Sequence, residues 1–160
     1  MIQVIEADLT LPAHADMVVR LTDMYARDEM AGGDGLRPEV AATLTSALLA
    51  HPARFQFIAI DEGGNGVGIA TCFMGFSTFN AAPLLNIHDL AAVPEVRGQG
   101  VASALIRAVE EKAAELGCCK VTLEVKVANE HARKVYGHLG FTETEVTNTA
   151  TLFCSKPITP

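Results

Sequence analysis

Apolar side chains recur with two periods along this chain, and each period predicts one kind of element. From Val121 to Val127 apolar and polar residues alternate, which is typical of a strand with one buried face. From Val101 to Leu116 apolar residues fall every three or four positions, which predicts an amphipathic helix that Gly117 ends. The same periods and their flanking turn residues predict further strands at about residues 2–7, 55–60, 67–79, 84–93 and 141–154, and further helices at 12–25, 38–48 and 129–139.

The order of these elements is strand, two helices, three strands, helix, strand, helix and strands. The chain has 160 residues, of which 49% are apolar, and this is enough for one sizeable core. The sequence contains no linker, repeat or low-complexity segment that would divide it. We therefore expect an α/β (α+β) fold in a single domain over residues 1–160.

The run from Val93 to Ala102 joins a predicted strand to the amphipathic helix and carries two glycines, Gly98 and Gly100. Glycine has no β-carbon, so a bulky anion can approach the backbone there, and unpaired amides at a helix start point toward such an anion. Arg97 adds a cation at the rim of this loop. The loop therefore predicts a binding site for a diphosphate.

Two common diphosphate ligands fit this loop less well. A nucleoside-triphosphate loop needs Gly-Lys-Ser/Thr, but Gly100 is followed by Val101 and Ala102. The loop does contain the first two glycines of a dinucleotide-binding motif, and Glu124 is a candidate for the acid that binds the ribose. However, Ser103 stands at the third glycine position, and only one strand-loop-helix-strand unit is present. The dinucleotide interpretation is the weaker alternative.

Two segments together point to a family. The loop 97–102 resembles the Arg/Gln-x-x-Gly-x-Gly/Ala signature of the GCN5-related N-acetyltransferases. Residues 129–141, Asn-Glu-His-Ala-Arg-Lys-Val-Tyr-Gly-His-Leu-Gly-Phe, resemble that family's Asn-x-x-Ala-x-x-x-Tyr-x-x-x-Gly-Phe segment at the expected distance downstream. The resemblance covers roughly residues 84–141, and the order and spacing of its two motifs make it specific.

The resemblance implies a mixed, mostly antiparallel sheet with helices on both faces and a splayed central strand pair. It also implies a single N-acetyltransferase domain that takes acetyl-CoA as its acetyl donor and transfers the acetyl group directly to a primary amine of a small molecule. A protein lysine or N-terminus as acceptor, and a non-catalytic acyl-CoA-binding module, are the alternatives. The residues expected to bind the cofactor are Leu90, Ala91, Ala92, Arg97, Gly98, Gln99, Gly100, Val101, Ala102, Ser103 and Asn129.

Tyr136 is the candidate general acid, because it lies seven residues after Asn129 and a phenol stays protonated at neutral pH. His88 is the candidate base; Asp89, Glu124 or a water molecule are the other possibilities. Neighbouring strand residues face opposite sides unless a bulge intervenes, so His88 and Asp89 are not expected to act as a direct pair.

Residues 76–79 and 85–90 loosely resemble the diamine acetyltransferase branch of the family. That branch carries Glu-Asp where this chain has His88-Asp89, which removes a negative charge that would hold a polyamine. The amine pocket is expected around the loop 32–35, the second helix and residues 76–79. The sequence therefore leaves the acceptor open.

Net charge, the spacing of His and Cys, and the absence of long apolar segments argue against several kinds of partner. A net charge of -7 without clustered Lys and Arg argues against nucleic acid. The histidines and four cysteines show no zinc-site spacing, so no metal is expected, and the cysteines are expected to be reduced. No segment is apolar enough to span a bilayer or to act as a leader, which predicts a cytoplasmic protein without a membrane partner. Related proteins are often homodimers, so a homodimer is possible.

Overall fold

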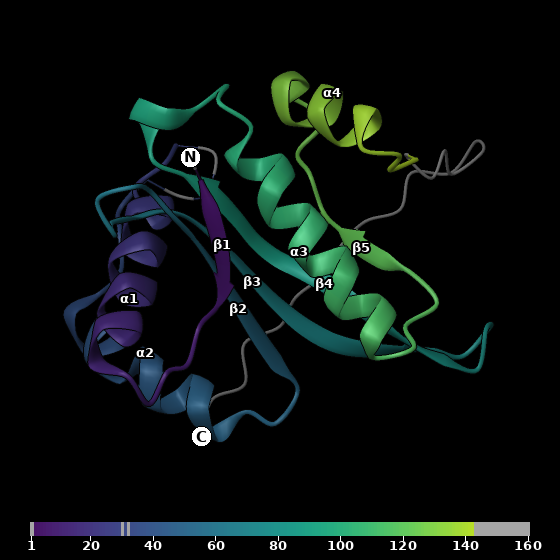
Figure 1. Cartoon of the computed structure of the whole chain (residues 1–160), viewed down its shortest axis with the longest axis horizontal. Helices are drawn as coiled ribbons and strands as arrows, with labels where there is room; N and C mark the ends of the chain where they lie inside the picture. The colour runs from purple at the N-terminus through teal and green to yellow at the C-terminus, as the bar shows by residue number, and fades with distance from the viewer. Residues whose placement is uncertain (1, 30, 32, 143–160) are drawn as a thin grey trace.

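The fold is described from a computed structural model, which places residues 2–29, 31 and 33–142 (Figure 1). The elements follow one another as β1 (Gln3–Glu6), α1 (Pro12–Ala26), α2 (Pro38–Ala50), β2 (Arg54–Ile60), β3 (Gly66–Ser77), β4 (Ala82–Ala92), a 3-10 turn (Pro94–Val96), α3 (Val101–Glu115), β5 (Val121–Leu123) and α4 (Glu130–His138). This order agrees with the predicted one up to α4. The strands expected over 141–154 lie almost wholly outside the described residues.

The five described strands form one sheet in the order β1-β2-β3-β4-β5. The first four pair antiparallel with their neighbours, and β5 pairs parallel with β4. The predicted mixed, mostly antiparallel sheet is therefore confirmed. Since every neighbour in the sheet is also the next strand in sequence, α3 is the connection that makes the β4–β5 pair parallel.

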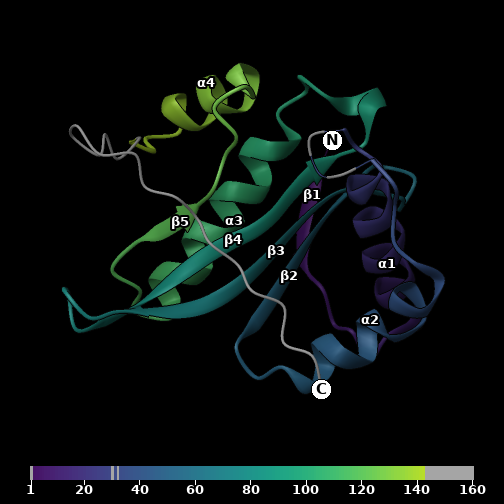
Figure 2. The ribbon, with the colours of Figure 1, turned by 180° about the vertical axis from the view of Figure 1, so that it is seen from behind.

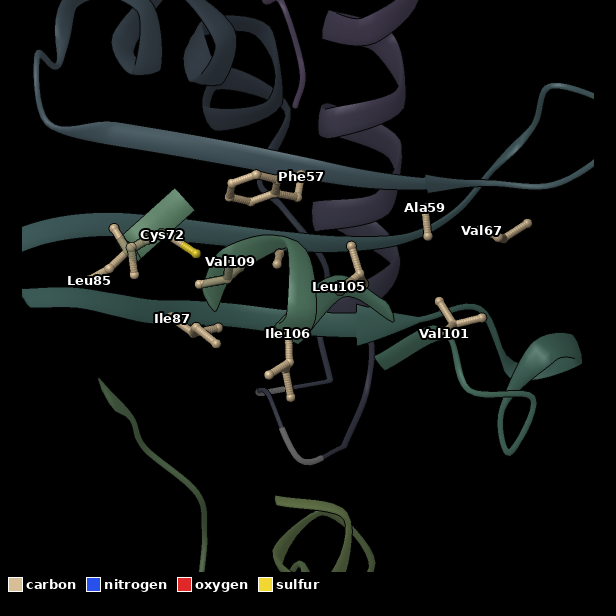
Figure 3. Packing of buried hydrophobic residues seen from close by; sticks show 12 residues of the cluster. Phe57, Ala59, Val67, Cys72, Leu85, Ile87, Val101, Leu105, Ile106 and Val109 are labelled. Carbon is tan, nitrogen blue, oxygen red and sulfur yellow. The ribbon is translucent and has the colours of Figure 1, made fainter. Parts of the chain in front are cut away.

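Helices cover both faces of this sheet, as Figures 1 and 2 show. On one face α3 presents Leu105, Ile106 and Val109, all without solvent exposure, to the sheet residues drawn in Figure 3. Each such side chain stabilises the fold by roughly 1.5–3 kcal/mol through burial. On the other face Val18 and Leu21 of α1 and Leu48 of α2 pack against Ile58 and Ile69. We call these two sides of the sheet the α3 face and the α1–α2 face.

A bulge in the middle of β4 changes which way its side chains point. Thr71 pairs with Asp89, but the next residue of β3, Cys72, pairs with Ile87, so His88 is an extra residue in β4. Ile87 packs on the α3 face, whereas His88 contacts Phe73, a residue of the α1–α2 cluster. Asp89 shares the face of its partner Thr71. His88 and Asp89 therefore lie on the same face, because the bulge is the exception to the opposite orientation expected for a regular strand.

The strands β4 and β5 separate soon after they pair. Three residue pairs, from Leu85–Val121 to Ile87–Leu123, join them, and β5 ends at Leu123. The strand predicted over 121–127 is therefore too long, because among the described residues no strand pairs with residues 124–127. Val127, for example, is 79% exposed. The splayed strand pair that the family resemblance implied is present.

The β3–β4 hairpin extends beyond the rest of the sheet (Figure 2). The sequence placed a break at Ala82 and Pro83, but both residues belong to β4 and pair with Ser77 and Phe76. Pro83 can occupy this position because its backbone groups face away from β3, where its carbonyl accepts a hydrogen bond from the amide of Cys119 at 2.8 Å, so its missing N–H removes no hydrogen bond to β3. The turn instead falls at 78–81, where Ala81 has a φ of 48°.

Candidate active site

A cavity of about 880 Å³ opens where β4 and β5 separate. Its walls come from the end of α1, the second half of β4, the loop before α3, the segment 124–126 and α4. This volume lies within the usual range of 300–1,000 Å³ for clefts that bind small molecules and cofactors. The predicted site residues that line it are His88, Leu90, Ala91, Ala92, Arg97, Gly98, Gly100, Val101, Ala102, Ser103, Asn129 and Tyr136.

The glycine loop presents free main-chain amides to this cavity. Gly98 and Gly100 have φ values of 78° and 83°, in the left-handed region, and Gly100 is the N-cap of α3. The first hydrogen bond of α3 runs from the amide of Ala104 to the carbonyl of Gly100. Within the described residues, the amides of Gly98 and of residues 100–103 donate to no backbone carbonyl. These donors and the helix start are suited to a diphosphate.

Gln99 differs from its neighbours in the loop. Its amide donates to the carbonyl of Val96 at 3.2 Å, and its side chain donates to the carbonyl of Glu95 at 3.1 Å. Gln99 also lies outside the cavity wall. These two hydrogen bonds hold the turn that shapes the loop, and the expected contact of Gln99 with the cofactor stays a prediction.

The bulge at His88 decides which groups of β4 point into the cavity. The amide of Leu85 donates toward β5, to the carbonyl of Lys120, whereas the amide of Val93 donates toward β3, to the carbonyl of Val67. Backbone groups alternate along a strand, so counting back from Val93 puts the N–H and C=O of Ala92 and Leu90 on the open edge. The Arg97 side chain accordingly reaches the carbonyl of Ala92 at 3.4 Å. Leu90, rather than Ala91, therefore offers its amide to the cavity.

Helix α4 forms the opposite wall. Asn129 caps the helix by accepting a hydrogen bond from the amide of Ala132 at 3.1 Å, as the sequence predicted. Asn129 and Tyr136 both line the cavity, two turns apart on one side of the helix. Burial and the nearby Tyr25 raise the pKa of Tyr136 above 10.0. The phenol therefore stays protonated at neutral pH and can donate a proton or a hydrogen bond.

His88 and Asp89 lie together beside the open edge of β4. His88 lines the cavity and is exposed, while Asp89 is partly buried next to it. Burial raises the pKa of Asp89, and the neighbouring His88 partly opposes this rise. Glu124, the other acid considered from the sequence, also lines the cavity but is exposed. In a regular strand these two consecutive side chains would point to opposite faces. The bulge instead brings His88 and Asp89 together on one face.

Two cavity residues at the end of α1 were missed by the sequence analysis. Tyr25 was expected only as the last residue of the helix over 12–25, and Asp28 was given no role. Burial, with Asp89 and Asp28 nearby, raises the pKa of the Tyr25 phenol. Asp28 accepts a hydrogen bond from Arg97 at 2.9 Å, across 69 residues of sequence. No local pattern could identify them, because their position depends on how α1 packs against β4.

Residues 76–79, expected at the amine pocket, lie away from this cavity. Phe76 lies three residues after Phe73 on β3, so it faces the opposite side of the sheet, and it is 63% exposed outside the cavity. Residues 76–79 therefore do not form a wall of this cavity. Among the described residues, no group of three or more His, Cys, Asp or Glu side chains is arranged to hold a metal. In the same part of the chain, no helix is long and apolar enough to cross a bilayer.

Comparisons with known proteins match both the fold and the motifs. A solved structure of a probable acetyltransferase superimposes with a TM-score of 0.80 at 25% identity, covering 97% of this chain and 99% of the other. The structure of AAC(6')-Iy in complex with the bisubstrate analogue CoA-S-monomethyl-acetylneamine gives a TM-score of 0.74 at 22% identity, covering 96% of this chain and 99% of the other.

Among curated proteins, N-alpha-acetyltransferase MAK3 of Arabidopsis thaliana is 38% identical over 87 residues. That match covers 53% of this chain and 43% of the relative, so this chain spans less than half of that protein. The sequence model described as the acetyltransferase (GNAT) family matches residues 19–141, which include the glycine loop, the bulge and Tyr136. The predicted family is confirmed, and this chain belongs to the GNAT family of acetyltransferases.

Proposed function

We propose that this protein is an N-acetyltransferase that moves the acetyl group of acetyl-CoA directly to a primary amine of a small molecule. Members of the GNAT family use acetyl-CoA, and the bisubstrate analogue bound by the structural neighbour joins CoA to an acetylated amine. The observation that carries the proposal is the arrangement of the cavity. Free amides at 98 and 100–103 stand at one end, and the Leu90 amide, His88 and Tyr136 surround the other.

The end of the cavity at the glycine loop and β4 binds the diphosphate and the extended pantetheine arm of CoA. The free amides of the loop, the start of α3 and Arg97 bind the diphosphate. The open edge of β4 at Leu90 and Ala92 offers the hydrogen bonds that a missing strand would take, and these hold the pantetheine arm. The side chain of Asn129 stays engaged as the cap of α4, so its part is to fix the helix that carries Tyr136.

The acceptor end removes a proton and activates the carbonyl. An alkylammonium has a pKa of about 10.4, so a base must take its proton before it can attack. His88 borders the cavity and accepts this proton, and the carboxylate of Asp89 stabilises the imidazolium that results. The N–H of Leu90 donates to the acetyl oxygen as negative charge develops on it.

The departing sulfur receives its proton from the opposite wall. As the new N–C bond forms and the C–S bond breaks, the Tyr136 phenol donates its proton to the thiolate of CoA, and the second proton of the amine nitrogen then passes through solvent to the phenolate, which leaves a neutral amide and a protonated Tyr136. Transfer is direct, without an acetylated cysteine: Cys72, the thiol near Asp89, is buried in the core and its pKa is raised to about 12. A thiol with this pKa stays protonated and is a poor nucleophile at neutral pH.

Release of free thiol from acetyl-CoA in the presence of a panel of primary amines tests the proposal, with mass spectrometry to identify the N-acetylated product. We expect thiol release with at least one small amine, and CoA should raise the melting temperature. An excess of 100 times Kd corresponds to about 2.7 kcal/mol of added stability. CoA binding without thiol release for any amine would instead favour a binding module, and stabilisation by NADH in place of CoA would favour the dinucleotide interpretation.

A further inference from the structure

Three rings lie together on the α1–α2 face: that of the base His88 and two others that the mechanism does not use. His51 follows the end of α2, Phe73 lies on β3, and His88 is the bulge residue of β4. The Phe73 ring centroid is 5.1 Å from that of His51 and 5.6 Å from that of His88, both with edge-to-face geometry. Both imidazoles are exposed, so this aromatic shelf (His51, Phe73 and His88) is open to solvent.

The inner end of the shelf coincides with the reacting centre. His88 belongs to both the shelf and the cavity, and Asp89 and the Leu90 amide follow it directly in sequence. Phe73 pairs with Asn86, so it lies on the order of 10 Å along the strand from Leu90. An acceptor whose nitrogen reaches the acetyl group from this side therefore lays the rest of its body over His88 and Phe73.

The outer end of the shelf carries a fixed cation. Arg54 pairs directly with Phe73, so the two side chains share the α1–α2 face. Its guanidinium is held by two hydrogen bonds, one to the carbonyl of Leu48 at 2.6 Å and one to the side chain of Gln56 at 3.2 Å. Asp8 lies near this guanidinium, and its carboxylate is already engaged by the amide and hydroxyl of Thr10. A second ammonium group at this end would therefore meet a positive charge that cannot move away. The shelf therefore disfavours diamines and polyamines and accepts an uncharged substituent.

We propose that the shelf of His51, Phe73 and His88 is an acceptor subsite that binds the flat, uncharged ring of a primary amine whose nitrogen is carried on a short flexible arm. This inference rests on the proposed acetyltransferase activity and narrows its acceptor class. Contacts between aromatic rings raise affinity a few-fold more than burial of the same apolar area alone. The selection against a second charge comes from Arg54 and is independent of the rings.

Three acceptors of matched chain length test the proposal: 4-phenylbutylamine, n-octylamine and 1,8-diaminooctane, each assayed for thiol release with saturating acetyl-CoA. We expect the lowest KM for 4-phenylbutylamine and the highest for the diamine. Phe73→Leu keeps an apolar side chain and removes the ring, so it should raise the KM for 4-phenylbutylamine about 3- to 10-fold and change that for n-octylamine much less. Phe76→Leu, on the same strand but on the opposite face, is the matched control and should change neither value.

His51→Ala provides a second variant, because His51 is exposed and its loss is less disruptive to the core than loss of Phe73. It should reduce the preference for the ring-bearing amine in the same direction. Equal KM values for ring and alkyl amines, a preference for the diamine, or a uniform loss with all amines in Phe73→Leu and His51→Ala would overturn the subsite. Absence of thiol release with every amine in the wild type would contradict the proposed function itself, so the two failures are distinguishable.

Discussion

Replacing Gly100 by alanine separates the strain of the loop from its role in binding. Gly100 has a φ of 83°, and a β-carbon built on it would meet no atom within 4 Å. The stability cost is therefore backbone strain alone, about 1 kcal/mol for an alanine in the left-handed region. For a domain of this size that lowers the melting temperature by about 2–4 °C.

The same methyl group has a second effect when CoA is bound. Gly100 lines the cavity and no atom stands within 4 Å of its built β-carbon, so we expect the added methyl group to meet the diphosphate there. Displacing the anion from one amide loses a hydrogen bond to a charged group, worth about 1.5–3 kcal/mol. Isothermal titration should therefore show a Kd for CoA weakened by about 10- to 100-fold.

Gly117 is the matched control. It ends α3, has a φ of 66° and likewise has no atom within 4 Å of its built β-carbon, but it lies outside the cavity. Gly117→Ala should lower the melting temperature by a similar amount and leave the affinity for CoA unchanged. The reasoning is refuted if Gly100→Ala binds CoA as the wild type does, or if Gly117→Ala loses as much affinity as Gly100→Ala.

Three further predictions follow from the described contacts. Tyr136→Phe should lower kcat by about 10²- to 10⁴-fold with CoA affinity unchanged in titration; a weakened CoA affinity with kcat unchanged would place Tyr136 in binding only. Gly68→Ala should lower the free energy of unfolding by about 1–3 kcal/mol in urea, because its β-carbon would stand 2.7 Å from Val101 and 3.1 Å from the Ala91 carbonyl; an unchanged midpoint would contradict this packing. Burial raises the pKa of Asp89 above 3.8, so the native state binds more protons than the unfolded state just above pH 3.8, and the free energy of unfolding falls as pH rises through that window. Asp89→Asn should therefore be more stable than the wild type at pH 7 and show no such gain below pH 3.8; a loss of stability at pH 7 would show that the carboxylate is held by favourable contacts.

The two motifs made the donor half of the site predictable from sequence. Gly98, Gly100 and Asn129 act through backbone geometry and helix caps, which are local properties of the chain, and the structure places all three on the cavity wall. Gln99 is the exception, because its amide closes a turn with Val96 that motif spacing does not reveal. The order of helices and strands was also predictable, because the spacing of apolar residues along each element reflects which of its faces is buried.

The acceptor half depends on contacts between distant segments, and these leave no local signature. The bulge that turns His88 and Asp89 to one face arises from the register between β3 and β4. Tyr25 and Asp28 enter the cavity because α1 packs over the end of β4. The length of β5 was overestimated for a related reason: alternation continues to Val127, but a strand ends where its partner diverges.

The contacts of the loop amides with bound CoA decide the central claim most directly. A crystal structure of the complex should show the diphosphate within about 3.2 Å of the main-chain nitrogens of residue 98 and residues 100–103, with the thiol end between Leu90 and Tyr136. A diphosphate bound elsewhere, or held by side chains while these amides face solvent, would contradict the account.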